Sequence, residues 1–150
     1  MNAQPGYARS GPDRDGMPSV DSAQSLRLDR LKRRSDFLRV AATRRRAAMP
    51  GLVLQIAETP ADATAGQPPT GHETARIGYT ASRKVGGAVQ RNRARRRLRA
   101  AVGRVMPAHA ASQRDYVVIA RKGTLDRPFE RLVGDLEAAL KRLDAWRPAP

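Results

Sequence analysis

The densest cluster of chemically active side chains in this sequence lies between residues 83 and 104. This span contains nine arginines and lysines and no acidic residue. Guanidinium groups bind phosphate oxygens in pairs and stack on nucleobases. A phosphate-rich polyanion is the kind of partner that neutralises so much positive charge in one place. The span therefore predicts a surface that binds a polyanion.

The same span has the periodicity of an amphipathic helix. Its apolar stripe consists of Leu98, Ala101, Val102 and Val105. Because a helix turns by about 100° per residue, the opposite arc carries Asn92, Arg93, Arg96, Arg97, Arg99 and Arg104. Arg91 and Arg95 flank the stripe, where their stems can cover apolar surface. We expect a helix from Ala88 to Met106 that Pro107 ends, with its basic side turned to a ligand.

Two further basic pairs follow predicted strands. Arg83 and Lys84 follow a strand at 76–82, and Arg121 and Lys122 follow a strand at 116–120. If these strands are neighbours, the four side chains gather at one edge of the sheet. On one face of the 76–82 strand, which carries Gly78, the side chains are small or hydroxylated. This leaves room for a ligand backbone to approach.

Side chains for enzymatic chemistry are sparse elsewhere. His72 and His109 have no neighbouring carboxylate or metal-spaced partner, and we interpret both as solvated. The acidic residues of the last predicted helix are interpreted as solvating charges that pair with Arg131 and Lys141. These acidic residues are Glu130, Asp135, Glu137 and Asp144. The sequence therefore predicts no catalytic residue and no metal site in the protein itself.

Composition limits the class of protein further. The formal net charge is +15, from 29 basic and 14 acidic residues, and there is no cysteine. Disulfides and thiolate metal sites are thus excluded, and a reducing compartment is permitted. No run of 18 apolar residues is present, and the N-terminus lacks the apolar region of a secretory signal. We expect a cytoplasmic protein with no membrane partner and no obligate protein partner.

The remaining elements are short and mixed. We expect a helix after Ser35 as N-cap, a strand at 51–57, a turn at 121–123 and a last helix that starts at Pro128. Separated strands and helices favour an α+β class, with helices covering a small sheet. Residues 1–25 are expected to be a disordered extension, 26–143 the domain, 58–74 a mobile loop and 144–150 a flexible tail.

Three blocks of this sequence together resemble the protein subunit of bacterial ribonuclease P. The longest block is residues 76–99, which contains the Arg91-Asn92-Arg93 motif directly after a strand and a glycine turn. The others are residues 31–37 and 115–122, and the resemblance spans residues 26–143. It implies a two-layer α/β sandwich with a four-stranded sheet and a left-handed βαβ crossover. Connections between parallel strands of one sheet are right-handed in about 98% of cases. Without the resemblance, we would therefore expect a right-handed crossover here.

The resemblance also implies a function. It implies that a ribonucleoprotein removes the 5′ leader of precursor tRNA, that the RNA subunit carries the chemistry with Mg²⁺, and that the protein binds both RNAs. The residues that would contact the catalytic RNA are Arg91, Asn92, Arg93, Arg95, Arg96 and Arg99. Those that would contact phosphates are Arg83, Lys84, Arg121 and Lys122.

Phe37 would line the leader groove by the same resemblance. From the residue alone, a core position and a stacking surface for a base remain equally open. The family often has a second aromatic one helical turn later, where this sequence has Ala41, and a tyrosine near Gln55. Stacking on the leader would therefore be weaker here and charge more important.

Other function classes fit parts of the sequence. A ribosomal or rRNA-binding assembly protein would share the charge and the fold class. A DNA-binding protein would use the basic helix in a major groove, but its face is too uniformly charged for base readout and no dimerisation heptad is present. A self-sufficient nuclease would need metal ligands that we do not find.

Overall fold

The computed structural model describes residues 26–63 and 73–148, so the predictions for residues 1–25 and for the 64–72 part of the expected loop at 58–74 lie outside the described residues. The described ends of that loop are partly regular, since Glu58 ends a strand, Ala61–Ala63 form a 3₁₀ turn and Thr74 begins a strand. The elements are β3 (Arg27–Arg30), α3 (Arg34–Ala42), β4 (Arg46–Ala48), β5 (Leu52–Glu58), the 3₁₀ turn η1 (Ala61–Ala63), β6 (Thr74–Thr80), α4 (Ala88–His109), β7 (Arg114–Ala120), α5 (Lys122–Asp126) and α6 (Phe129–Arg142).

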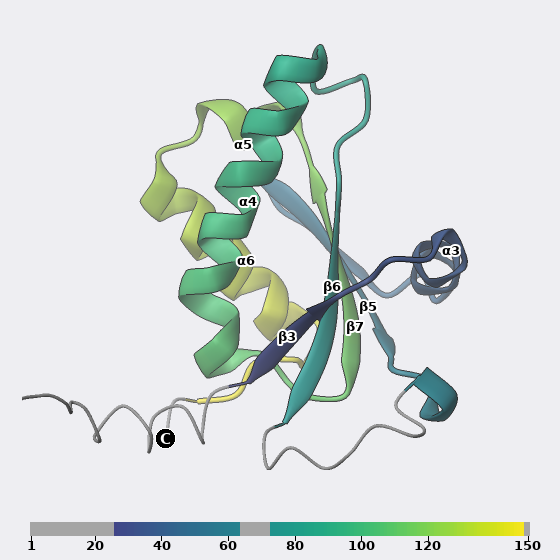
Figure 1. Ribbon diagram of the computed structural model, residues 1–150. Coiled ribbons are helices and arrows are strands. Elements are labelled where there is room, and N and C mark those ends of the chain that lie inside the picture. Colours follow the sequence, from purple (N-terminus) through teal and green to yellow (C-terminus); the bar gives the residue numbers. More distant parts are fainter. Residues whose placement is uncertain (1–25, 64–72, 149–150) are drawn as a thin grey trace, which may run out of the picture.

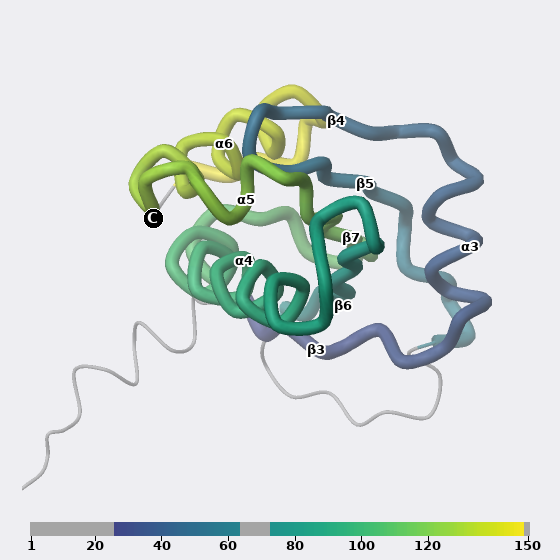
Figure 2. Tube along the Cα trace, turned by 90° about the horizontal axis from the view of Figure 1, so that it is seen from above, coloured from purple at the N-terminus to yellow at the C-terminus, as the bar shows by residue number. Residues whose placement is uncertain are grey.

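The strands form one five-stranded sheet in the order β3-β6-β7-β5-β4. β6 pairs in parallel with both β3 and β7, whereas β5 pairs antiparallel with β7 and β4. Because β6 and β7 are parallel neighbours, the chain must cross over between them, and α4 makes this crossover. The connection is left-handed (Figures 1 and 2). The α+β class is confirmed, with five strands in place of the expected four.

Helices cover the two faces of the sheet unequally. α4, α5 and α6 lie on one face, and α3 lies alone on the other (Figure 1). The main core fills the space under α4 and α6, where Leu98, Leu136 and Tyr116 are fully buried. A second, smaller cluster under α3 contains Leu31, Val40, Ala57 and Val117. The weakly covered face is therefore the one beside α3.

Two strands were not expected. β3 and β4 have four and three residues and begin with Arg27 and Arg46. Both are edge strands, whose backbone hydrogen bonds depend on a partner far away in the sequence. Charged residues are common on such edges because they oppose pairing with other chains. Neither strand therefore carries the apolar alternation that marks a strand in sequence.

Several helix boundaries differ from the predictions. α3 begins at Arg34, which places Ser35 inside the helix. α4 continues through Pro107 to His109, because a proline in the last turn removes one hydrogen bond while the Ala110 amide still donates to the Met106 carbonyl at 3.0 Å. The expected turn at 121–123 is the start of α5, and Pro128 is the N-cap of α6.

The expected flexible tail at 144–150 packs against the domain in its described part, residues 144–148. Ala145 is buried, and Trp146 stacks on His109 with ring centroids 4.0 Å apart. The His109 ring also hydrogen-bonds to the Arg147 carbonyl through Nδ1 at 2.8 Å. His109 is therefore a packing residue and not a solvated one, since the segment after α6 returns to the end of α4.

Asp135 also departs from its prediction as a solvating charge. Its side chain is buried, accepts a hydrogen bond from the Gly51 amide at 2.9 Å and pairs with Arg127. It thereby ties α6 to the start of β5. No helix in the described part of the chain is long and apolar enough to cross a membrane.

Candidate nucleic-acid interface

The four basic residues that follow β6 and β7 do gather at one edge of the sheet. Thr80 and Ile119 are register partners, so the two strands end side by side. The first turn of α4 and α5 lie at the same edge (Figure 1). All four side chains, Arg83, Lys84, Arg121 and Lys122, are exposed. Within the described residues Arg121 donates from Nη1 to the Met49 carbonyl at 2.8 Å, and the other three side chains have no polar partner.

The amphipathic design of α4 is confirmed. Its buried stripe contains the four predicted residues, extended by Ala94 and Met106. Arg91 and Arg95 are half-buried beside the stripe, as expected. Asn92, Arg93, Arg96 and Arg99 are exposed. We call Arg91, Asn92, Arg93, Arg95, Arg96 and Arg99 the arginine face of α4.

No arginine of this face pairs with a carboxylate among residues 26–63 and 73–148. Its one hydrogen bond there runs from Arg95 Nη1 to Asn92 Oδ1, at 3.2 Å. Five uncompensated guanidinium groups on one helix repel each other in the free protein. Binding an anion would relieve this repulsion, so the arginine face is free to meet a polyanion.

Two other arginines of α4 are used inside the protein. Arg97 donates from Nε to the Thr124 carbonyl at 2.8 Å and from Nη2 to the Arg127 carbonyl. These carbonyls lie in and just after α5, where the helix leaves acceptors unpaired. Arg104 pairs with Glu130 of α6. The prediction that Arg97 faces a ligand with the rest of the polar arc is therefore wrong, because α5 packs within reach of its long side chain. Arg104 stays exposed, but its charge is already paired.

Phe37 combines the two roles that the sequence left open. It lies on α3, is partly buried, and packs against the small cluster under that helix. Its ring also covers Gly78 of β6: a Cβ built on Gly78 would lie 2.5 Å from the ring Cζ. Any larger residue would have to displace the ring, so the close approach favours glycine here. The room that the small strand face offers at Gly78 is taken by this ring.

A buried carboxylate anchors α3 beside the sheet, and sequence reasoning missed it. Asp115 of β7 is 0% exposed. It accepts hydrogen bonds from Arg76 of β6 (Nε at 2.9 Å and Nη2 at 2.6 Å), from Thr59 Oγ1 at 2.8 Å and from Arg39 of α3. Burial alone would raise the pKa of Asp115, but these hydrogen bonds outweigh it and lower the pKa below its usual range.

Asp36 joins the same network from the residue next to Phe37. Its Oδ1 accepts from Arg39 at 3.3 Å and from Arg76 at 3.4 Å. The pKa of Arg76 is raised, mainly by the hydrogen bond to Asp115. The network fixes the height of α3 over the sheet and hence the position of the Phe37 ring. No spacing in the sequence reveals it, since its members come from four separate segments.

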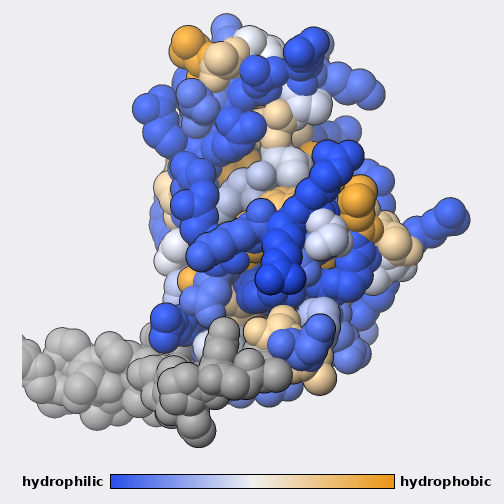
Figure 3. Space-filling view, turned by 45° about the vertical axis from the view of Figure 1, so that its right-hand side comes forward, coloured by the Kyte–Doolittle hydropathy of each residue, from blue (hydrophilic) through white to orange (hydrophobic). Residues whose placement is uncertain are grey.

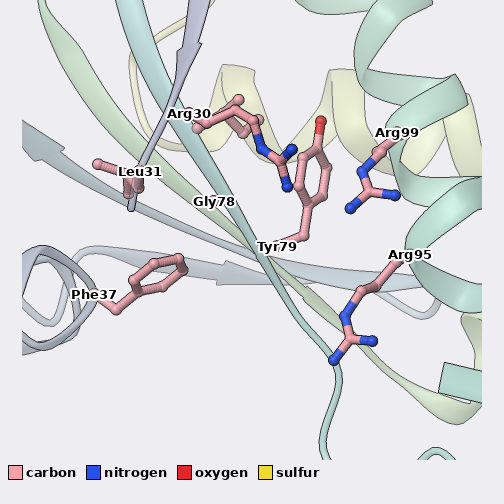
Figure 4. A pocket seen from close by; sticks show the side chains of 8 residues that line it. Arg30, Leu31, Phe37, Gly78, Tyr79, Arg95 and Arg99 are labelled. Carbon is pink, nitrogen blue, oxygen red and sulfur yellow. The ribbon is translucent and has the colours of Figure 1, made fainter. Parts of the chain in front are cut away.

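A cavity of about 150 Å³ lies between α3 and α4, at the free edge of β6 (Figure 4). Its lining residues are Arg30, Leu31, Phe37, Ile77, Gly78, Tyr79, Arg95 and Arg99. The sequence analysis predicted ligand contact for three of them, Phe37, Arg95 and Arg99. It predicted room for a ligand at a fourth, Gly78, and all four line this cavity. Figure 3 shows the surrounding surface as mainly hydrophilic with small apolar patches. A ligand bound here would meet both the arginine face of α4 and the aromatic side of α3.

Residues 26–144 match the Ribonuclease P family. The ribonuclease P protein component of Paramagnetospirillum magneticum is 60% identical over 121 residues, which cover 81% of this chain and 86% of that protein. The one from Caulobacter vibrioides is 40% identical over 126 residues, covering 84% and 78%.

Solved structures agree with this match. The RNase P protein of Staphylococcus aureus aligns with a TM-score of 0.60 at 24% identity, covering 79% of this chain and 97% of that one. The RNase P protein of Thermotoga maritima aligns with a TM-score of 0.59 at 25% identity, covering 76% and 96%. The likeness in sequence and in fold therefore extends over the whole described domain.

Proposed function

This chain belongs to the ribonuclease P protein family, and we propose on that basis that it is the protein subunit of a ribonucleoprotein endoribonuclease that removes the 5′ leader of precursor tRNA. The observation that carries this proposal is the arginine face of α4. Four of its six side chains are exposed and two are half-buried, and none has a carboxylate partner in the described part of the chain. An RNA partner supplies the missing negative charge.

The arginine face is proposed to dock on the catalytic RNA subunit. α4 packs on the core through its whole apolar stripe, so its position is fixed before RNA arrives. Guanidinium groups held on a rigid helix bind phosphates with little further loss of side-chain freedom. The charged edge with Arg83, Lys84 and Lys122 continues the same surface towards the end of the sheet.

The sheet face beside α3 is proposed to hold the single-stranded leader of precursor tRNA. Phe37 offers a ring for base stacking, which is tolerant of sequence. The basic edge residues offer contacts to the leader phosphates. Because one aromatic residue lies on this part of α3, charge is expected to dominate the affinity, and the leader affinity should fall steeply with salt.

The chemical step is proposed to belong to the RNA subunit. In the part of the chain that the structure describes, no group of three or more His, Asp or Glu side chains could hold a metal ion. On the strength of the family resemblance, we assign Mg²⁺ to the RNA subunit and the precursor, where it would activate water and stabilise the leaving oxygen. The protein residues bind and orient the two RNAs, and we propose that they do so in the cytoplasm.

Reconstitution tests this proposal. Cleavage of a 5′-labelled precursor tRNA is measured at low Mg²⁺ with the chain alone, with a bacterial ribonuclease P RNA alone and with both. We expect no cleavage by the chain alone and strong stimulation of the RNA. A chain that binds the RNA without stimulating cleavage would contradict the proposal and favour an rRNA-binding assembly role.

A further inference from the structure

The cavity at the edge of β6 exists because β3 is shorter than its neighbour. β3 ends at Arg30, and the last backbone contact at this edge runs from the Leu31 amide to the Ile77 carbonyl at 2.9 Å. β6 continues to Thr80, so from Gly78 onward no strand of the described residues lies beside this edge. The chain turns away at Leu31 towards α3, and α4 lies on the other side. The result is an open notch that connects the two faces of the sheet.

Three guanidinium groups line this notch, and no carboxylate of residues 26–63 or 73–148 does. They come from Arg30 of β3 and from Arg95 and Arg99 of α4. Arg99 lies over the Tyr79 ring, with its Cζ 5.4 Å from the ring centroid. Figure 4 shows Arg30 and Arg99 on either side of this ring, with Arg95 below. Cations from two distant segments thus converge on one small volume.

Tyr79 adds a neutral donor to the three cations. It is half-buried, and its hydroxyl has no hydrogen-bond partner among the described residues. Burial raises the pKa of Tyr79, while Arg99 and Arg30 act against that rise. A neutral phenol beside arginines can donate a hydrogen bond to an anion but cannot neutralise them. The hydroxyl is not among the buried polar atoms that lack a partner, so water can reach it, and a ligand oxygen can take the place of that water.

The other side of the notch is apolar. Leu31 and Phe37 lie on the other side of β6 from Arg95 and Arg99, and Gly78 of β6 lies between them (Figure 4). The volume of about 150 Å³ has room for several water molecules, and hence for a tetrahedral phosphate group. A ligand that fits has a single dense negative charge and a flat or apolar part next to it. One nucleotide of a single-stranded RNA has this character.

We propose that this notch binds one phosphodiester group of an RNA strand that passes from the arginine face of α4 to the Phe37 side of the sheet. Arg30, Arg95, Arg99 and the Tyr79 hydroxyl contact the phosphate, and the attached nucleoside lies towards Leu31 and Phe37. This inference rests on the proposed RNA-binding function. It adds Arg30 and Tyr79 to the interface and makes the notch a point of contact for a particular phosphate.

Two variants separate the charge from the hydroxyl. Arg30→Gln removes one exposed cation and should weaken RNA binding about tenfold, lowering the slope of log K against log salt by about 0.7. Tyr79→Phe keeps the packing and should weaken binding about three- to fivefold without changing that slope. The matched control is Arg131→Gln, an exposed arginine of α6 outside the interface, which should change neither quantity.

Each variant is titrated, as the full chain, against the ribonuclease P RNA and against a precursor tRNA. A loss with one RNA identifies that strand as the source of the phosphate. A scan of neutral methylphosphonate linkages in that RNA should then find one position where the substitution abolishes the effect of Arg30→Gln. Both results support the proposal.

The proposal is overturned if Arg30→Gln and Tyr79→Phe match Arg131→Gln with both RNAs, or if no single linkage is coupled to Arg30. In that case the unsubstituted chain would still stimulate cleavage by the RNA, so the proposed function would stand. Only the proposal that the notch binds a phosphate would be rejected. Thermal unfolding of both variants checks that the fold is intact.

Discussion

The Phe37 ring of α3 lies directly on the backbone of Gly78 in β6. A Cβ at Gly78 would lie 2.5 Å from the ring Cζ and 3.3 Å from Leu31 Cβ. The contact joins the helix that carries the aromatic side chain to the strand at the centre of the proposed interface. It fixes the position of the ring on which an RNA base is proposed to stack.

Gly78→Ala should displace the Phe37 ring. Because the ring is the far end of a side chain, the protein should still fold, with a loss of about 1–3 kcal/mol from overpacking. Precursor tRNA with a leader should bind less tightly by about 1 kcal/mol, part of the value of one base stack, whereas mature tRNA should bind unchanged. The measurement is a pair of binding titrations with the two tRNAs.

Gly134→Ala in α6 is the matched control for that variant. Among the described residues, nothing beyond the neighbouring helix backbone lies within 4 Å of a Cβ at Gly134, and alanine in a helix interior is more stable than glycine by about 0.5–1 kcal/mol. The control should gain stability and keep its affinity for both tRNAs. Equal losses for precursor and mature tRNA with Gly78→Ala would show that Phe37 does not touch the leader.

Arg96 and Arg97 are neighbours in α4 with different roles: Arg96 belongs to the arginine face, and Arg97 donates to backbone carbonyls at α5. Arg96→Gln should leave the free energy of unfolding unchanged and lower the slope of log K against log salt for RNA by about 0.7–0.9. Arg97→Gln should lower the free energy of unfolding by about 1–3 kcal/mol, because two carbonyls lose a charged donor, and should keep the slope. Chemical denaturation and salt titration measure the two quantities. If Arg97→Gln lowered the slope of log K against log salt as much as Arg96→Gln does, Arg97 would also bind RNA, and the two residues would not differ in role.

Asp115 should make stability depend on pH in the acid range. Its pKa is lowered in the folded protein, so the folded state binds its proton less readily than the unfolded state. The carboxylate therefore stabilises the fold above the unfolded pKa of about 3.8, and this contribution is lost as the pH falls below that value. Asp115→Asn should cost about 2–3 kcal/mol at neutral pH and flatten the acid limb of a plot of stability against pH. If the stability of the variant fell equally steeply at acid pH, other carboxylates would be responsible for the pH dependence.

The sequence predicted those features that depend on local pattern. The core side of α4 and the strands β5, β6 and β7 follow from apolar periodicity, and the arginine face follows from the absence of acidic residues. The joint edge of β6 and β7 was predicted only on the condition that these strands are neighbours, which the register confirms.

Features that depend on tertiary neighbours could not be predicted from local sequence patterns. Arg97 looks like Arg96 until α5 is placed beside it, and Asp115 acquires its partners from segments up to 76 residues away. The edge strands β3 and β4 are visible only through their partners. The left-handed crossover runs against the usual preference, and it was expected from the family resemblance alone.

The most direct test of the account uses the fact that the chain contains no cysteine. Val89 is 76% exposed and lies four and seven residues before Arg93 and Arg96, on the same side of α4. A Val89→Cys variant can carry a tethered reagent that cleaves nearby RNA, with Arg131→Cys on α6 as the control. The account predicts strong, localised cleavage of the catalytic RNA from position 89 and little from position 131. Stronger cleavage from position 131, or none from position 89 in a complex that is active, would contradict it.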